Sequence, residues 1–71
     1  MPPSGRRVIA VLQGMGFDVV TQVGSHVKLR RVVNGQDVMV TVPLHKEVKR
    51  GTLSGIAKQV GLTLRELEAL A

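Results

Sequence analysis

The sequence contains no cysteine, no tryptophan and no tyrosine, and it has a single phenylalanine among 71 residues. Without cysteine, neither a disulfide nor a thiolate zinc site can stabilise the chain, which fits a reducing compartment. No apolar run approaches the roughly 18 residues needed to span a bilayer. The first residues also lack the small-residue cleavage site of a signal peptide. We therefore expect a cytoplasmic protein that does not contact membranes.

The chain has room for one compact domain, which we place at residues 1–71. Its hydrophobic content of 44% is too high for a disordered basic tail. A domain this short buries roughly 60% of its unfolded surface and is only marginally stable alone. Because disulfides and thiolate zinc are excluded, binding to a partner is the remaining source of added stability.

Positive charge is concentrated in the first fifty residues. Ten Lys and Arg residues stand against five Asp and Glu, and the two signs balance after residue 50, so the whole net charge of +5 precedes Gly51. The charge falls in three clusters: Arg6 with Arg7, Lys28 with Arg30 and Arg31, and Lys46 with Lys49 and Arg50. Such clusters can neutralise phosphates, although ordinary solvated surface charge would give the same composition.

Apolar spacing predicts two helices and a short third helical turn. Behind a Ser4 N-cap, Val8, Val11, Leu12 and Met15 recur at i, i+3, i+4 and i+7, and Gly16 is placed to close the helix in a left-handed conformation. We expect Thr52 to cap a second helix that stops at Gly61. Thr63 and Glu66 then have the spacing of a capping box, which opens the final turn.

Alternating residues predict three strands between the helices. From Phe17 to Val23, odd-numbered residues would share one face and even-numbered residues the other. Gly24-Ser25 and Asn34-Gly35 supply tight turns, and a third strand through Val38, Val40 and Val42 ends at Pro43. Residues 44–51 are expected to form a basic loop. The prediction is an α+β fold in which both helices cover one face of a three-stranded antiparallel sheet and leave the other face open.

The open face would carry His26, Lys28 and Arg30, because Val27 and Leu29 alternate with them. A histidine can accept or donate a proton at neutral pH, and the two cations can hold a phosphodiester. A general base with a cationic clamp suffices for attack by a ribose 2′-hydroxyl on its own phosphate. Alternatively, His26 is an exposed residue without a role.

Two further features fit phosphate chemistry. His45 is either a proton donor opposite His26 or a polar loop residue, because sequence separation does not tell whether they meet. Lys49 and Arg50 directly precede the expected helix, whose N-terminal N–H groups favour anions. The carboxylates are scattered, and no zinc-ligand cluster or glycine-rich phosphate loop is present. We therefore expect any nuclease activity to need no metal and no cofactor.

The order of several short motifs resembles the HicA toxins, small mRNA interferases of prokaryotic toxin-antitoxin systems. These motifs are Ser4-Gly5, Gly16-Phe17, Gly24-Ser25-His26, Val42-Pro43-Leu44-His45, and Gly51-Thr52-Leu53 with Lys58-Gln59-Val60-Gly61-Leu62. The resemblance implies a fold like the double-stranded RNA-binding domain and a catalytic role for His26 in cutting RNA. It also implies a HicB antitoxin partner, so we expect a free monomer that forms a hetero-oligomer with the antitoxin.

The candidate site therefore has one catalytic residue, His26, and eight RNA-binding residues: Gly24, Ser25, Lys28, Arg30, His45, Lys46, Lys49 and Arg50. Many HicA toxins follow the motif with a second histidine and an aromatic residue, where this chain has Val27-Lys28-Leu29. We therefore expect binding to the RNA backbone with little base stacking. Two other functions remain open, a non-catalytic RNA-binding module and a subunit that docks an acidic protein.

Overall fold

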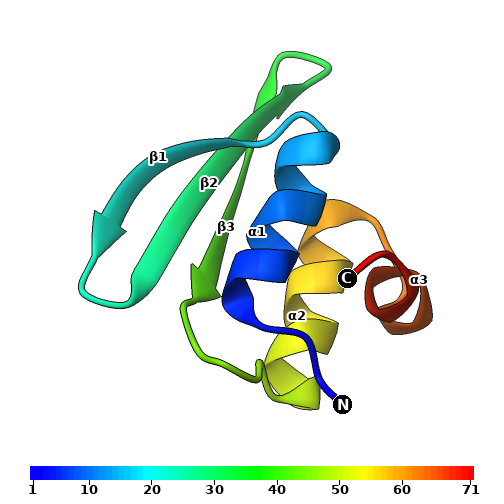
Figure 1. Ribbon diagram of the computed structural model, residues 1–71. Helices are drawn as coiled ribbons and strands as arrows, with labels where there is room; N and C mark the ends of the chain where they lie inside the picture. The colour runs from blue at the N-terminus through cyan, green and yellow to red at the C-terminus, as the bar shows by residue number, and fades with distance from the viewer.

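A computed structural model describes residues 1–71 and shows one sheet with every helix on one side of it (Figure 1). The elements run α1 (Gly5–Gly14), β1 (Asp18–Val23), β2 (His26–Val33), β3 (Gln36–Pro43), α2 (Arg50–Val60) and α3 (Leu64–Leu70). The strands are antiparallel in the order β1-β2-β3. The expected α+β architecture with an open sheet face is confirmed.

Helix α1 begins and ends as the sequence predicts. The Ser4 hydroxyl accepts a hydrogen bond from the Arg7 N–H (3.2 Å), which satisfies one of the free donors at the helix start. Val8 and Leu12 are fully buried. Gly16 has φ 95°, the left-handed conformation that glycine adopts without strain. The apolar stripe of α1 therefore faces the sheet.

Strand β1 departs from the predicted alternation. Val19 pairs with Leu29 but Thr21 pairs with Lys28, so the register shifts by one residue at Val20 and the strand contains a β-bulge. Beyond the bulge the two faces exchange, which places Gln22 opposite the buried Val27. The expectation that residues 17, 19, 21 and 23 share one face is therefore wrong.

The β2–β3 hairpin follows the sequence pattern closely. Asn34 and Gly35 both have positive φ, 51° and 77°, as a two-residue turn of this kind requires. Val27 and Leu29 on β2 and Val40 and Val42 on β3 are buried against the helices, and β3 ends at Pro43 as expected. Phe17, which precedes β1, is also buried in this core.

Helix α2 begins earlier than the Thr52 cap predicts. Lys49 is the N-cap, without a side-chain capping bond, and the Leu53 N–H already donates to the Lys49 carbonyl (2.9 Å). Val48 and Leu53 are both buried, one on each side of the helix start, which is the arrangement of a hydrophobic staple. The staple, rather than the threonine hydroxyl, fixes where α2 starts.

The C-terminal segment is a full helix of seven residues. Thr63 and Glu66 form the predicted capping box, with side-chain to backbone distances of 2.9 and 3.0 Å. Leu67 is fully buried against α1 and α2. The Arg7 guanidinium donates two hydrogen bonds to the Ala71 carbonyl (2.9 and 3.1 Å) and so joins α1 to the end of α3.

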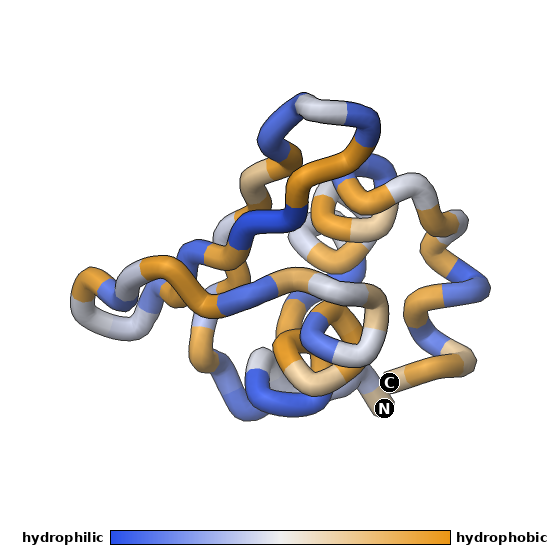
Figure 2. Tube along the Cα trace, turned by 90° about the horizontal axis from the view of Figure 1, so that it is seen from above, coloured by the Kyte–Doolittle hydropathy of each residue, from blue (hydrophilic) through white to orange (hydrophobic).

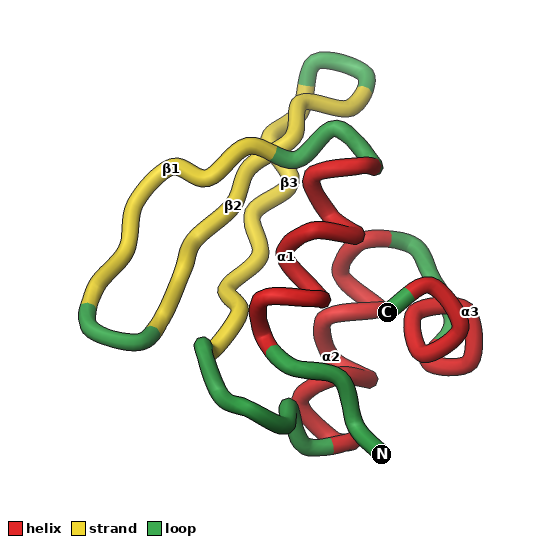
Figure 3. The backbone as a smooth tube through the Cα atoms, in the orientation of Figure 1, coloured by secondary structure: helices red, strands yellow, loops and turns green.

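The core contains twelve apolar side chains and no polar or charged one. None of the three helices has the length and apolar character needed to cross a lipid bilayer. The backbone trace in Figure 3 shows the sheet extending well past the helices, which leaves the β1–β2 hairpin projecting. All titratable side chains lie at the surface, so any chemistry must occur there.

Candidate nucleic-acid interface

His26 is the first residue of β2 and points to the open face of the sheet. It pairs with Val23 on β1 and with Pro43 on β3, while the next residue, Val27, is buried against the helices. Because adjacent side chains in a strand point to opposite faces, the imidazole is on the solvent side. The sequence-based placement of His26 is confirmed.

The turn before His26 is held by the end of β3. The Leu44 N–H donates to the Ser25 carbonyl (2.7 Å), and the Gln22 side-chain amide donates to the Gly24 carbonyl (3.0 Å). Gly24 has φ 58°, which a residue with a side chain adopts only with strain. Gly24 and Ser25 therefore form a fixed turn that positions His26.

The start of α1 packs against the same end of the sheet. The Gly5 N–H donates to the His45 carbonyl (2.9 Å), and the Val48 N–H donates to the Pro3 carbonyl (2.8 Å). His45 lies only two residues beyond the register partner of His26, and its side chain is exposed. The structure therefore brings the two histidines to one end of the sheet.

Lys28 and Arg30 lie on the open face but differ in their surroundings. At roughly 3.3 Å per residue, Lys28 is about 7 Å and Arg30 about 13 Å along the strand from His26. Arg30 forms an ion pair with Asp37 (3.1 Å) on β3, and both side chains are about half exposed. Lys28 forms no ion pair, so it is the cation available nearest to His26 on this strand.

The third basic cluster surrounds the start of α2. Lys46 is exposed in the loop after β3, Lys49 is the N-cap, and Arg50 is the first helical residue. The sequence had suggested that Arg50 and Gly51 precede the helix. This is wrong, because both residues belong to its first turn. No acidic residue lies in that turn, so its free N–H groups and the nearby cations all favour an anion.

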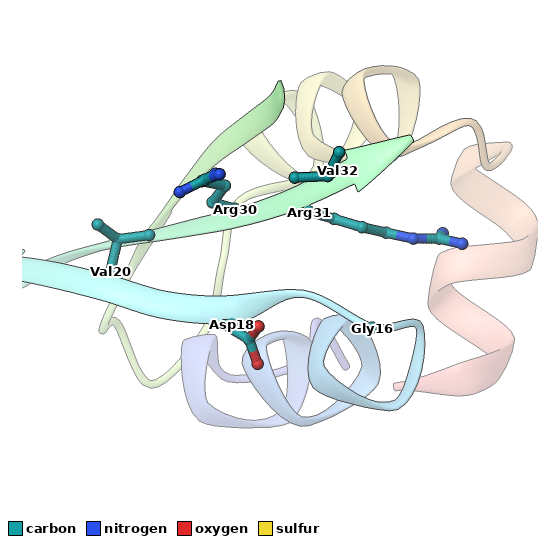
Figure 4. Close-up of a pocket in the computed structure, with 6 residues that line it drawn as sticks. All are labelled: Gly16, Asp18, Val20, Arg30, Arg31 and Val32. Atoms are coloured by element: carbon teal, nitrogen blue, oxygen red, sulfur yellow. The ribbon is translucent and has the colours of Figure 1, made fainter. Parts of the chain in front are cut away.

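The other arginines do not form one surface. Arg7 donates hydrogen bonds to the Ala71 carbonyl, whereas Arg6 lies beside the β1–β2 hairpin on the side of the sheet that faces the helices. Figure 4 shows Arg30 and Arg31 leaving β2 in different directions around a shallow pocket of about 360 Å³, with Asp18 on β1 below them. The side chains of the Arg6–Arg7 cluster, and those of the cluster of Lys28, Arg30 and Arg31, therefore do not all point in one direction.

Sequence reasoning overlooked two residues that shape this region. A Cβ on Gly5 would collide with the Pro43 carbonyl oxygen, so only glycine permits this contact. The sequence did contain a signal for this contact, because Gly5 stands at the first position of a helix, which glycine weakens. The position of Asp37 could have been inferred from the Asn34-Gly35 turn, because this turn sets the register of β2 and β3 and puts Asp37 diagonal to Arg30.

No three His, Asp or Glu side chains gather as metal ligands would.

Comparison with known families agrees with this description. The family model of the HicA toxin of bacterial toxin-antitoxin systems matches residues 5–62. The match begins at the first residue of α1 and ends just after α2, so it includes every candidate site residue. Searches of curated proteins and of solved structures gave no match.

Proposed function

The chain belongs to the HicA toxin family, and we propose that it is a metal-independent endoribonuclease that cleaves mRNA and thereby inhibits translation. The observation that carries the proposal is the exposed His26 at the end of a sheet face that also presents Lys28 and Arg30. We place the reaction in the cytoplasm, where the free toxin is a monomer and a HicB-like antitoxin binds it in a hetero-oligomer.

In the proposed reaction, His26 acts as the general base. Its imidazole removes the proton of a ribose 2′-hydroxyl, whose oxygen attacks the adjacent phosphorus while the bond to the 5′-oxygen breaks. The products are a 2′,3′-cyclic phosphate and a free 5′-hydroxyl, which takes its proton from His45 or from water. Lys28, the nearest free cation on β2, offsets the charge that develops on the phosphate.

The remaining cations extend the binding site along the RNA backbone. Arg30, farther along the strand, lies beside a different phosphate from the one near His26, and its ion pair with Asp37 keeps it from adding a full phosphate contact. Lys46, Lys49 and Arg50 continue the track past His45 to the start of α2. Gly24 and Ser25 hold the turn on which His26 depends.

The test is RNA cleavage by the wild type and by His26→Ala in the presence of EDTA. We expect the variant to lose at least 100-fold in cleavage rate, since a positioned general base contributes roughly 10²- to 10⁴-fold. Its melting temperature should not change, because the side chain is exposed. Gln59→Ala, an exposed residue of α2, is the matched control. Undiminished cleavage by His26→Ala would remove the catalytic assignment.

A second candidate, a non-catalytic RNA-binding module, is favoured by one observation. No hydrogen bond from another residue orients the His26 imidazole, whereas catalytic histidines are commonly held by a bond to the second ring nitrogen. The basic surface would suffice for binding the RNA backbone without chemistry. Tight binding of a single-stranded transcript without any shortening of it would select this function.

A further inference from the structure

We propose that the antitoxin docks on the free edge of β1 by adding an extended acidic segment to the sheet, with an apolar side chain in the groove between β1 and α1. The inference rests on the antitoxin partner that the HicA family implies. It concerns where and how that partner binds, which neither the family match nor the cleavage chemistry determines.

The edge of β1 is open along its whole length. β1 pairs only with β2, and all six of its residues are exposed. Val19, Val20 and Val23 are 47%, 53% and 74% exposed, an unusual concentration of apolar surface on one short strand. Figure 2 shows hydrophobic stretches along the hairpin that projects beyond the helices. An edge strand with unpaired backbone groups is a template for another strand.

A groove of about 380 Å³ lies beside this edge, on the side of the sheet that faces the helices. Its lining residues are Arg6 and Ile9 of α1, Val19 and Gln22 of β1, Val27 of β2 and Leu44 after β3. Alternate side chains of a strand added to β1 would project toward this side of the sheet. A branched apolar residue there would contact Val19 and Ile9.

Charge favours an acidic partner over a second copy of this chain. Arg6 lies at the groove and its guanidinium forms no hydrogen bond or ion pair, so it is free to bind a carboxylate. Each copy carries a net charge of +5, which opposes self-association.

The first experiment measures amide hydrogen exchange in the full chain, free and in complex with its antitoxin. We expect the β1 amides from Val19 to Val23 to exchange at least tenfold more slowly in the complex. Protection of β1 in the free chain at high concentration would instead indicate a second copy, and protection by a single-stranded RNA alone would indicate RNA. Either result, or no protection of β1, would overturn the inference.

The second experiment compares antitoxin affinity between matched variants. Val19→Asp should weaken binding at least tenfold, whereas Leu70→Asp, at a site on α3 that is 59% exposed against 47% for Val19, should change it less than threefold. Arg6→Glu and Arg65→Glu form a second pair with equal charge change. RNA cleavage by free Val19→Asp should remain, so loss of docking is distinguishable from failure of the proposed function. Equal affinities within both pairs would rule out this docking site.

Discussion

Gly5 determines how closely α1 approaches the end of β3. A Cβ at this position would meet the Pro43 carbonyl oxygen and lie 3.0 Å from the Leu44 Cα. The same residue donates the backbone hydrogen bond that holds His45. The absence of a side chain at Gly5 therefore allows the start of α1 to lie close to the end of β3, at the end of the sheet where the two histidines lie.

We expect Gly5→Ala to destabilise the protein by roughly 2–3 kcal/mol, because overpacking against backbone cannot be relieved by moving a side chain. Gly55→Ala is the matched control, since a Cβ there meets nothing and Gly55 lies inside α2. That substitution should stabilise by about 0.5–1 kcal/mol. Urea unfolding measures both, and similar effects from the two substitutions would contradict the close contact.

The placement of single residues was predictable where alternation alone decides it. The exposure of His26, Lys28 and Arg30 follows from the burial of Val27 and Leu29, and the structure agrees. The Arg30–Asp37 pair needed the register of two strands as well. The approach of His45 to the His26 end depends on hydrogen bonds from Gly5 and Leu44, which no local pattern contains.

Among the elements, α3 shows how a short helix is stabilised by packing. Its seven residues are too few for a stable isolated helix, yet Leu67 is fully buried and Arg7 binds the Ala71 carbonyl. The capping box was evident in the sequence, but the length of the helix was not. That length depends on the surface that α1 and α2 offer to Leu67.

We expect Leu67→Ala to destabilise the protein by about 2–4 kcal/mol, through lost burial and the cavity that remains. Leu70→Ala, on the same helix but 59% exposed, should change stability by less than about 0.5 kcal/mol. Thermal unfolding followed by circular dichroism distinguishes the two. Equal melting temperatures would show that α3 does not belong to the cooperative unit.

The boundaries of β1 and α2 were predicted less well than their existence. Alternation in residues 17–23 does not reveal the bulge at Val20, because a bulge is defined by the partner strand. The start of α2 was assigned to Thr52 from its capping preference, although the buried Val48 places the start at Lys49. In both cases a tertiary contact overrides a local preference.

At the scale of the whole molecule, the net charge of +5 is divided among several faces. Lys28 lies on the open face, and Lys46, Lys49 and Arg50 lie on the loop and the first turn of α2, while Arg6 faces the groove beside β1 and Arg7 is bound within the protein. Overall composition therefore overstates the charge available to RNA. About four cations, namely Lys28, Lys46, Lys49 and Arg50, are free to contact its backbone.

This count predicts the salt dependence of RNA binding. Single-stranded nucleic acid gives a slope of log affinity against log salt of about −0.7 per neutralised phosphate, so four contacts give a slope near −3. The affinity of His26→Ala for a single-stranded transcript should then fall by roughly 50-fold between 50 and 200 mM salt. Fluorescence anisotropy titrations measure the slope. Asp37→Asn, made in the same His26→Ala protein, frees Arg30 from its ion pair and should steepen the slope by about 0.7. A slope near zero both with and without Asp37→Asn would contradict binding through the RNA backbone.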